Sequence, residues 1–213
     1  MFFTALLILV CLIGLSLTLL GEYRGRTSWM VAGKLMAAST YVALALVEGA
    51  WTSDWGRILL LGMAFCWAGD LLLIATRRRS LFLGGLAAFL AGHVCYSIAF
   101  FVRGVSADGV LLPAILVGIF LVAVQRWLRP YLQGAMVLPV HAYLAAISIM
   151  WLLAISTHAA SGGLALLAGA SLFVVSDLSV ARNRFVAPAL FNRLWGLPVY
   201  FSAQLLLAWS TAS

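Results

Sequence analysis

Long apolar stretches separated by short polar segments are the feature that most limits what this chain can fold into. Hydrophobic residues make up 65% of its 213 residues and charged residues only 9%, whereas a soluble domain typically carries ~25% charged residues. A soluble domain of this size would still expose a large share of its surface, so the apolar surface needs lipid as its solvent. The sequence therefore predicts an integral membrane protein.

The apolar stretches match the length that a helix needs to cross a bilayer, which is ~20 residues. Backbone groups in lipid must find hydrogen-bond partners within their own segment, and this requirement favours helices. We predict an all-α fold, a polytopic transmembrane bundle of about eight helices in a single domain over residues 1–213. The predicted spans are residues 2–20, 29–50, 56–75, 81–102, 109–128, 135–156, 162–181 and 194–212.

Positive charge is distributed unevenly over the connections between these spans. The odd-numbered connections hold ten of the 13 Lys and Arg residues, the even-numbered ones hold two, and Lys34 lies inside the second span. Because cytoplasmic loops are enriched in basic residues, we predict that the odd connections are cytoplasmic and that both termini lie on the opposite side. The same bias accounts for the net charge of +7 without a nucleic-acid partner. A multi-pass protein of a bacterial inner membrane is expected.

Spans three and seven share a weak pattern. In each, a Gly precedes an Asp (Asp70 or Asp177) by eight residues, a Leu follows it directly, and an Arg follows it after seven. Two spans that differ by four in number run in the same direction across the membrane. The pattern is compatible with a weak 4+4 parallel repeat.

Ionisable side chains inside the spans are the candidates for function, because each is costly to place in lipid. They are Lys34, Asp70, His93, His141 and Asp177. At ~1.5 Å per residue, all but His93 lie about 6–9 Å into the membrane from the cytoplasmic side. Tyr200 and Gln204 fall at a similar or slightly greater depth, and His93 and Tyr96 lie nearer the midplane. We expect one polar pocket that opens toward the cytoplasmic leaflet.

Several of these residues also have structural explanations. Lys34 either extends its amine to the interface or pairs with an aspartate. The aspartates can be partners in structural ion pairs, and the histidines, Tyr200 and Gln204 can form hydrogen bonds between helices.

Four motifs resemble the YhhN family, which includes the lysoplasmalogenases. They are Gly69-Asp70, Gly92-His93 with Tyr96, Ser176-Asp177, and Tyr200 with Gln204, in that order over spans three to eight. Lys34-Leu35 resembles a Lys-Pro of that family, with Leu in place of Pro. The resemblance implies hydrolysis of the vinyl ether bond of lysoplasmalogens, giving a fatty aldehyde and glycerophosphoethanolamine or glycerophosphocholine.

Acid catalysis suits this reaction. Protonation of the β-carbon gives an oxocarbenium ion, to which water adds. Two carboxyl groups can supply the acid and the base, as they do in glycosidases, and Asp70 and Asp177 are the predicted pair with their roles left open. His93 is the alternative acid or proton shuttle.

The remaining candidates are expected to bind or position the substrate, a single-chain phospholipid that enters from the cytoplasmic leaflet. Lys34 would hold one aspartate ionised, and Tyr96, His141, Tyr200 and Gln204 would position water or the ether oxygen. Arginines of the 77–79 and 182–184 clusters, represented by Arg77 and Arg184, would meet the phosphate, although topology alone also explains these clusters. No metal or other cofactor is expected.

Three other functions fit some of the same residues. A metallohydrolase would use His93, His141 and an aspartate as zinc ligands, although no HExxH-type spacing is present. A transporter or proton pathway would use the buried Asp and Lys residues as ion sites. A retinal-binding protein would need Lys34 as its Schiff base, and Lys34 lies too near the membrane edge for that.

Overall fold

The computed structural model describes residues 2–75 and 79–212, and these residues form helices and no strand. The eight α-helices are α1 (Phe2–Tyr23), α2 (Thr27–Val47), α3 (Asp54–Leu72), α4 (Arg79–Arg103), α5 (Leu111–Leu128), α6 (Val137–Ser161), α7 (Leu164–Ala181) and α8 (Leu190–Trp209). The all-α class and the predicted number of helices are confirmed. Short connections join the helices, as expected for spans that run antiparallel to their neighbours.

Seven of the helices in the described part of the chain, α1 to α7, are long and apolar enough to cross a membrane. Helix α8 is also 20 residues long, but its polar residues lower its mean hydropathy. Asn192, Gly196, Tyr200 and Gln204 lie four residues apart on α8, and all four are buried. Since residues four apart share one face of a helix, α8 turns a polar stripe toward the other helices.

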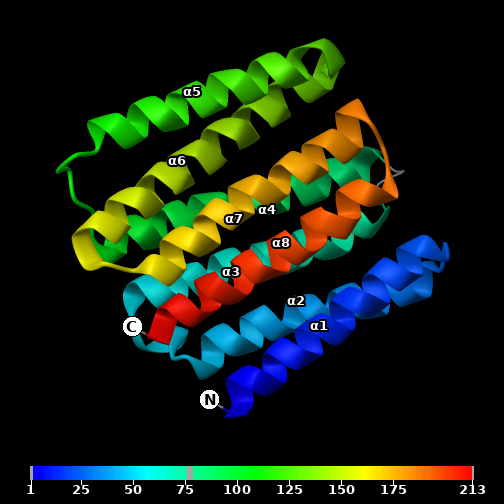
Figure 1. Ribbon diagram of the computed structural model, residues 1–213, viewed down its shortest axis with the longest axis horizontal. Helices are drawn as coiled ribbons and strands as arrows, with labels where there is room; N and C mark the ends of the chain where they lie inside the picture. Colours follow the sequence, from blue (N-terminus) through cyan, green and yellow to red (C-terminus); the bar gives the residue numbers. More distant parts are fainter. Residues whose placement is uncertain (1, 76–78, 213) are drawn as a thin grey trace.

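Consecutive helices run in opposite directions, so that the connections gather at two ends of the bundle (Figure 1). One end carries both termini. The other carries the α1–α2, α5–α6 and α7–α8 connections, and we refer to it as the arginine-rich end. Its described arginines are Arg24, Arg26, Arg79, Arg126, Arg129, Arg182, Arg184 and Arg193. That this end faces the cytoplasm remains a prediction.

Small residues let the helices approach closely, as is common where lipid supplies no hydrophobic drive for helix association. The pairs α1/α2, α3/α4 and α7/α8 make the most extensive contacts, whereas α5 packs mainly against α6. Gly62 of α3 lies against the ring of Tyr96 on α4, and a Cβ at position 62 would come within 2.5 Å of that ring. This close packing fixes the position of Tyr96 at the centre of the bundle.

We expect Gly62→Val to lower the free energy of unfolding by about 1–3 kcal/mol, because the added methyl groups would overlap the Tyr96 ring. Thermal unfolding in detergent should show the lower midpoint. Gly118→Val is the matched control, since nothing lies within 4 Å of a Cβ at that position of α5. Equal midpoints for the two variants would contradict this packing.

Candidate active site

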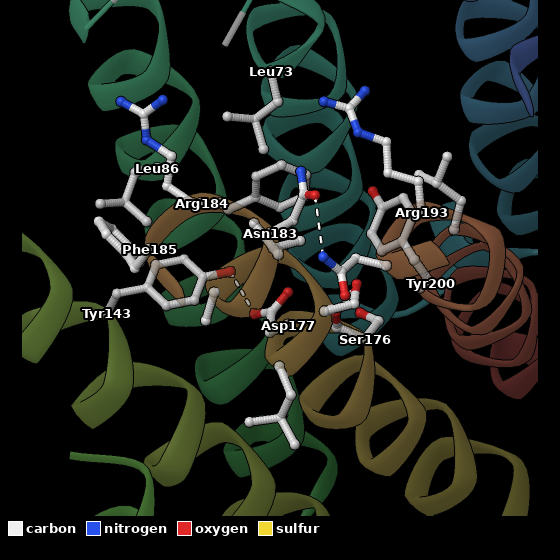
Figure 2. Close-up of a pocket in the computed structure, with 18 of the residues that line it drawn as sticks. Leu73, Leu86, Tyr143, Ser176, Asp177, Asn183, Arg184, Phe185, Arg193 and Tyr200 are labelled. Atoms are coloured by element: carbon white, nitrogen blue, oxygen red, sulfur yellow. Dashed lines mark hydrogen bonds between the residues drawn. The ribbon is translucent and has the colours of Figure 1, made fainter. Parts of the chain in front are cut away.

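A cavity of about 340 Å³ lies among the helices near the arginine-rich end, and all eight helices contribute to its wall. Its volume is within the range of roughly 300–1,000 Å³ that is usual for small-molecule sites. Part of the wall is polar, and Figure 2 shows several of these side chains directed toward the same space. The ionisable and amide side chains and tyrosines of the wall are Lys34, Asp70, Tyr143, Asp177, Asn183, Arg184, Asn192, Arg193 and Tyr200.

Asp70 is the centre of the first group of contacts in this wall. Its carboxyl group is buried, with Lys34 Nζ 3.1 Å from Oδ1. The phenol of Tyr200 donates to Oδ2 at 2.7 Å and that of Tyr41 donates to the same oxygen at 3.3 Å. Lys34 also donates to the backbone carbonyl of Asp70 at 3.1 Å. One lysine and two phenols thus satisfy a single buried carboxylate.

Helix geometry explains why these donors converge on Asp70. Lys34 and Tyr41 are seven residues apart on α2, which is close to two turns, so both side chains lie on one face. The Lys34 side chain is only 11% exposed. Of the two interpretations of Lys34, the structure therefore gives ion pairing with an aspartate rather than extension to the interface.

The contacts of Asp70 extend inward through a chain of hydrogen bonds. Gln204 Nε2 donates to the phenol oxygen of Tyr200 at 3.2 Å. The hydroxyl of Tyr96 donates to Gln204 Oε1 at 2.7 Å. Tyr96 and Gln204 are completely buried and do not line the cavity. They hold Tyr200 from behind, and through Tyr200 they orient Asp70.

Asp177 has a different set of partners. Tyr143 donates its hydroxyl hydrogen to Asp177 Oδ2 at 2.6 Å, and Figure 2 shows this bond. His93 Nε2 lies 3.8 Å from the same oxygen. The Asp177 side chain is 16% exposed, compared with 2% for Asp70, so Asp177 is the more open of the two carboxyl groups. Among the described residues, no Lys or Arg nitrogen lies within 4 Å of Asp177.

The hydrogen bond of His93 Nδ1 fixes the orientation and the tautomer of the ring. Nδ1 lies 2.7 Å from the carbonyl oxygen of Phe89, and because a carbonyl only accepts, Nδ1 must carry a hydrogen. In the neutral ring, Nε2 is then an acceptor. This atom is fully buried and has no hydrogen-bond partner within the described residues. The one unpaired nitrogen of the ring therefore faces the Asp177 carboxyl group.

A polar turn contributes to the cavity wall at the arginine-rich end. A π-helical turn, Arg182–Val186, follows α7, and turns of this kind occur frequently at functional sites. Asn192, which is buried, accepts from Arg182 at 2.5 Å and donates to Asn183 at 3.2 Å. Figure 2 places Asn183 between the side chains of Arg184 and Arg193. Two guanidinium groups thus stand at one side of the cavity, with Asp177 and Tyr143 opposite.

The guanidinium groups are held by contacts of their own. That of Arg184 lies over the Phe82 ring, with the guanidinium carbon 4.2 Å from its centre. Arg193 Nη1 pairs with Glu22 Oε2 at 2.5 Å. Both arginines belong to the cavity wall, so their positive charges are fixed in place. We call Arg184 and Arg193 the basic rim.

Another part of the wall is entirely apolar. It is formed by one face of α5 and one face of α6, with Phe120, Val124, Leu128, Val140, Leu144 and Ile147. We call these six residues the apolar arm. The wall of one cavity therefore contains an apolar region, two arginines and two carboxyl groups.

The structure brings together most of the residues predicted from the sequence. Lys34, Asp70, Asp177, Arg184 and Tyr200 line the cavity. Behind them, His93 faces Asp177, Gln204 donates to Tyr200, and Tyr96 donates to Gln204.

Two predicted residues are not part of this arrangement. His141 does not line the cavity, and its Nδ1 bonds to the Val137 carbonyl of its own helix at 2.7 Å. Arg77 lies outside the described residues. The described residues also contain no group of three or more His, Cys, Asp or Glu side chains placed to hold one metal ion.

Sequence reasoning missed Tyr41, Tyr143, Asn183, Asn192 and Arg193. Tyr41 had a usable signal, because it lies two turns from Lys34 on the same helix. Tyr143 and Arg193 had none, since a tyrosine or an arginine near the end of a span is usual at a membrane interface.

Comparison with known proteins places these residues in a family context. The sequence model described as the YhhN family matches residues 1–211. The lysoplasmalogenase TMEM86A of Bos taurus is 32% identical over 158 residues, which cover 71% of this chain and 64% of that protein. TMEM86A of Homo sapiens is 31% identical over the same shares of the two chains.

A third relative, lysoplasmalogenase TMEM86B of Sus scrofa, is 33% identical over 131 residues, 62% of this chain and 54% of that protein. The matched region therefore spans less than two thirds of the length of these relatives. No solved structure matches the chain.

We expect Lys34→Met to lower the free energy of unfolding by about 3 kcal/mol, because removal of one partner leaves a buried charge without its counter-ion. The double variant Lys34→Met with Asp70→Leu should recover most of that loss, since neither charge then remains. Denaturation in mixed micelles measures both.

Arg57→Gln is the control for this pair. Its partner is Asp54, and the two side chains are 61% and 82% exposed, so its effect should be close to zero. A Lys34→Met variant as stable as the wild type would show that Asp70 does not depend on this lysine.

Proposed function

The chain belongs to the YhhN family, and on that premise we propose that it hydrolyses the vinyl ether bond of lysoplasmalogens. The relatives named above as lysoplasmalogenases support this activity. The products would be a fatty aldehyde and glycerophosphoethanolamine or glycerophosphocholine. The observation that carries the proposal is that one cavity is lined by two differently partnered carboxyl groups, by the apolar arm and by the basic rim.

The reaction needs one proton on carbon and one water. Transfer of a proton to the β-carbon of the vinyl ether leaves a positive charge shared by the adjacent carbon and oxygen. Water adds to that carbon, loses a proton and gives a hemiacetal, which breaks its bond to the glycerol oxygen to release aldehyde and alcohol. The group that took the proton from water then gives it to the leaving glycerol oxygen, and the group that protonated the carbon regains a proton from the hemiacetal hydroxyl, so both groups are restored with one water consumed.

We assign the carboxylate role to Asp70. Its pairing with Lys34 and the two phenol donors favour the ionised form, because all three stabilise negative charge on its oxygens. A fixed carboxylate beside the ether would stabilise the oxocarbenium ion and accept the proton from the attacking water. Tyr200, held by Gln204 and Tyr96, would be a positioning residue for this group.

We assign the proton-donor role to Asp177. It has no lysine or arginine nitrogen within 4 Å among the described residues, and it accepts from one phenol where Asp70 has a lysine and two phenols, so less stabilises its negative charge and the neutral acid is favoured. His93 Nε2, which faces Asp177 at 3.8 Å, would exchange a proton with it between turnovers, directly or through one water. Tyr143 would fix the orientation of the carboxyl group. His141 receives no part, since it does not line the cavity.

The substrate would lie along the cavity with its tail in the apolar arm and its phosphate at the basic rim. Arg184 is the described arginine of the predicted clusters that lines the cavity, and guanidinium groups bind phosphate through paired hydrogen bonds. A lysolipid would reach this position from the leaflet at the arginine-rich end. We propose that this leaflet is the cytoplasmic one of a bacterial inner membrane.

The test uses purified protein, a lysoplasmalogen and its saturated ether analogue, with aldehyde as the readout. The wild type should release aldehyde only from the vinyl ether. Asp70→Asn and Asp177→Asn should each lower kcat/KM by about a hundredfold or more, because each removes a proton-transfer group.

Asp54→Asn is the matched control. Asp54 lies at the opposite end of the bundle, where it pairs with Arg57, so its replacement should leave the rate near that of the wild type. Undiminished activity in both the Asp70 and the Asp177 variants would overturn the proposal. Substrate-independent ion uptake by liposomes, without aldehyde release, would favour a transporter instead.

A further inference from the structure

Glu22 is an acidic residue that the proposed reaction does not use. The sequence has only six acidic residues. Glu48, Asp54 and Asp108 lie at the end of the bundle that carries the termini, and Asp70 and Asp177 belong to the cavity. Glu22, in the last turn of α1, is therefore the one acidic residue at the arginine-rich end outside the cavity wall.

Glu22 is tied to the cavity through Arg193. Arg193 lies in the first turn of α8 and lines the cavity, and its Nη1 is 2.5 Å from Glu22 Oε2. The two side chains are 24% and 22% exposed, so the pair is partly accessible. A carboxylate beside an arginine at the rim of a cavity places both signs of charge at one point.

Both members of the pair have bonding capacity left. A guanidinium carries five N–H donors and a carboxylate can accept about four hydrogen bonds. Within the described residues, Arg193 is the hydrogen-bonded partner found for Glu22. The second carboxylate oxygen and the other edges of the guanidinium are therefore able to bind a ligand that carries both charges.

The rim has the charge pattern of a zwitterion acceptor. Figure 2 shows Arg184 and Arg193 on either side of Asn183 with their guanidinium groups extended in the same direction. Two arginines alone would favour the most negatively charged head group. The carboxylate of Glu22 offsets one of these charges and repels a second negative charge on the ligand, while it attracts a cation next to the phosphate.

We propose that Arg193 and Glu22 form a head-group site for a phosphoethanolamine, in which Arg193 binds the phosphate and Glu22 binds the ammonium group. This inference rests on the proposed function and specifies its substrate. An ammonium with N–H donors suits a carboxylate acceptor better than a trimethylammonium, so ethanolamine is favoured over choline.

The experiment compares two vinyl ether substrates that differ only in the head group, one with phosphoethanolamine and one with phosphate alone. Glu22→Gln should lower kcat/KM for the ethanolamine substrate about tenfold, mainly through KM, because a charge-assisted contact is lost. The same change should raise kcat/KM for the amine-free substrate, because a repelling carboxylate is removed. Glu22→Asp should keep part of the ethanolamine preference.

Glu48→Gln is the matched control, since Glu48 lies at the opposite end of the bundle and accepts from Thr4. An equal change for both substrates in Glu22→Gln would mean that Glu22 only anchors α1 to α8, and it would overturn the head-group site. Binding of the saturated ether analogues, with and without the amine, gives a second readout that needs no turnover. Absence of aldehyde from both substrates would contradict the proposed reaction. The head-group site would still be supported if the wild type bound the amine-containing analogue more tightly and Glu22→Gln lost that preference.

Discussion

The ion pair between Lys34 and Asp70 is the interaction on which the rest of the arrangement depends. A charge inside a bilayer is expensive, and this one is tolerated because a lysine and two phenols satisfy the carboxylate. The donors come from α2 and α8 and the acceptor from α3, so one carboxylate fixes three helices relative to one another. Tyr96 and Gln204 extend this control to α4. A polar network of this kind makes a unique helix packing in a medium that offers little hydrophobic drive.

The proposed chemical use of the cavity rests on the contrast between its two carboxyl groups. Asp70 is enclosed by donors, while Asp177 meets one phenol and the acceptor nitrogen of His93. Groups of the same kind in unlike surroundings can act as acid and base in one reaction. The basic rim and the apolar arm make one part of the cavity wall positively charged and another part apolar. In the proposed binding mode, a single-chain amphiphile lies with its tail at the apolar arm and its head group at the basic rim.

The sequence predicted the helices and most of the polar residues of the site. The length of an apolar stretch and the cost of burying a charge can both be judged from one segment at a time. It was not sufficient for the direction in which each helix faces. His141 and Tyr143 lie two residues apart, about 200° around a helix, and only Tyr143 reaches the cavity. In a span that is apolar on all sides, periodicity does not mark the inward face. The Glu22–Arg193 contact joins residues 171 positions apart, which no local pattern indicates.

The central claim is that the reacting bond lies between two carboxyl groups with different partners. A structure of the protein bound to the saturated ether analogue tests it most directly. The account predicts that the ether oxygen and its first chain carbons lie in the cavity within contact of both Asp70 and Asp177, with the tail along the apolar arm. An analogue whose ether lies outside the cavity, or reaches only one of the two carboxyl groups, would contradict it.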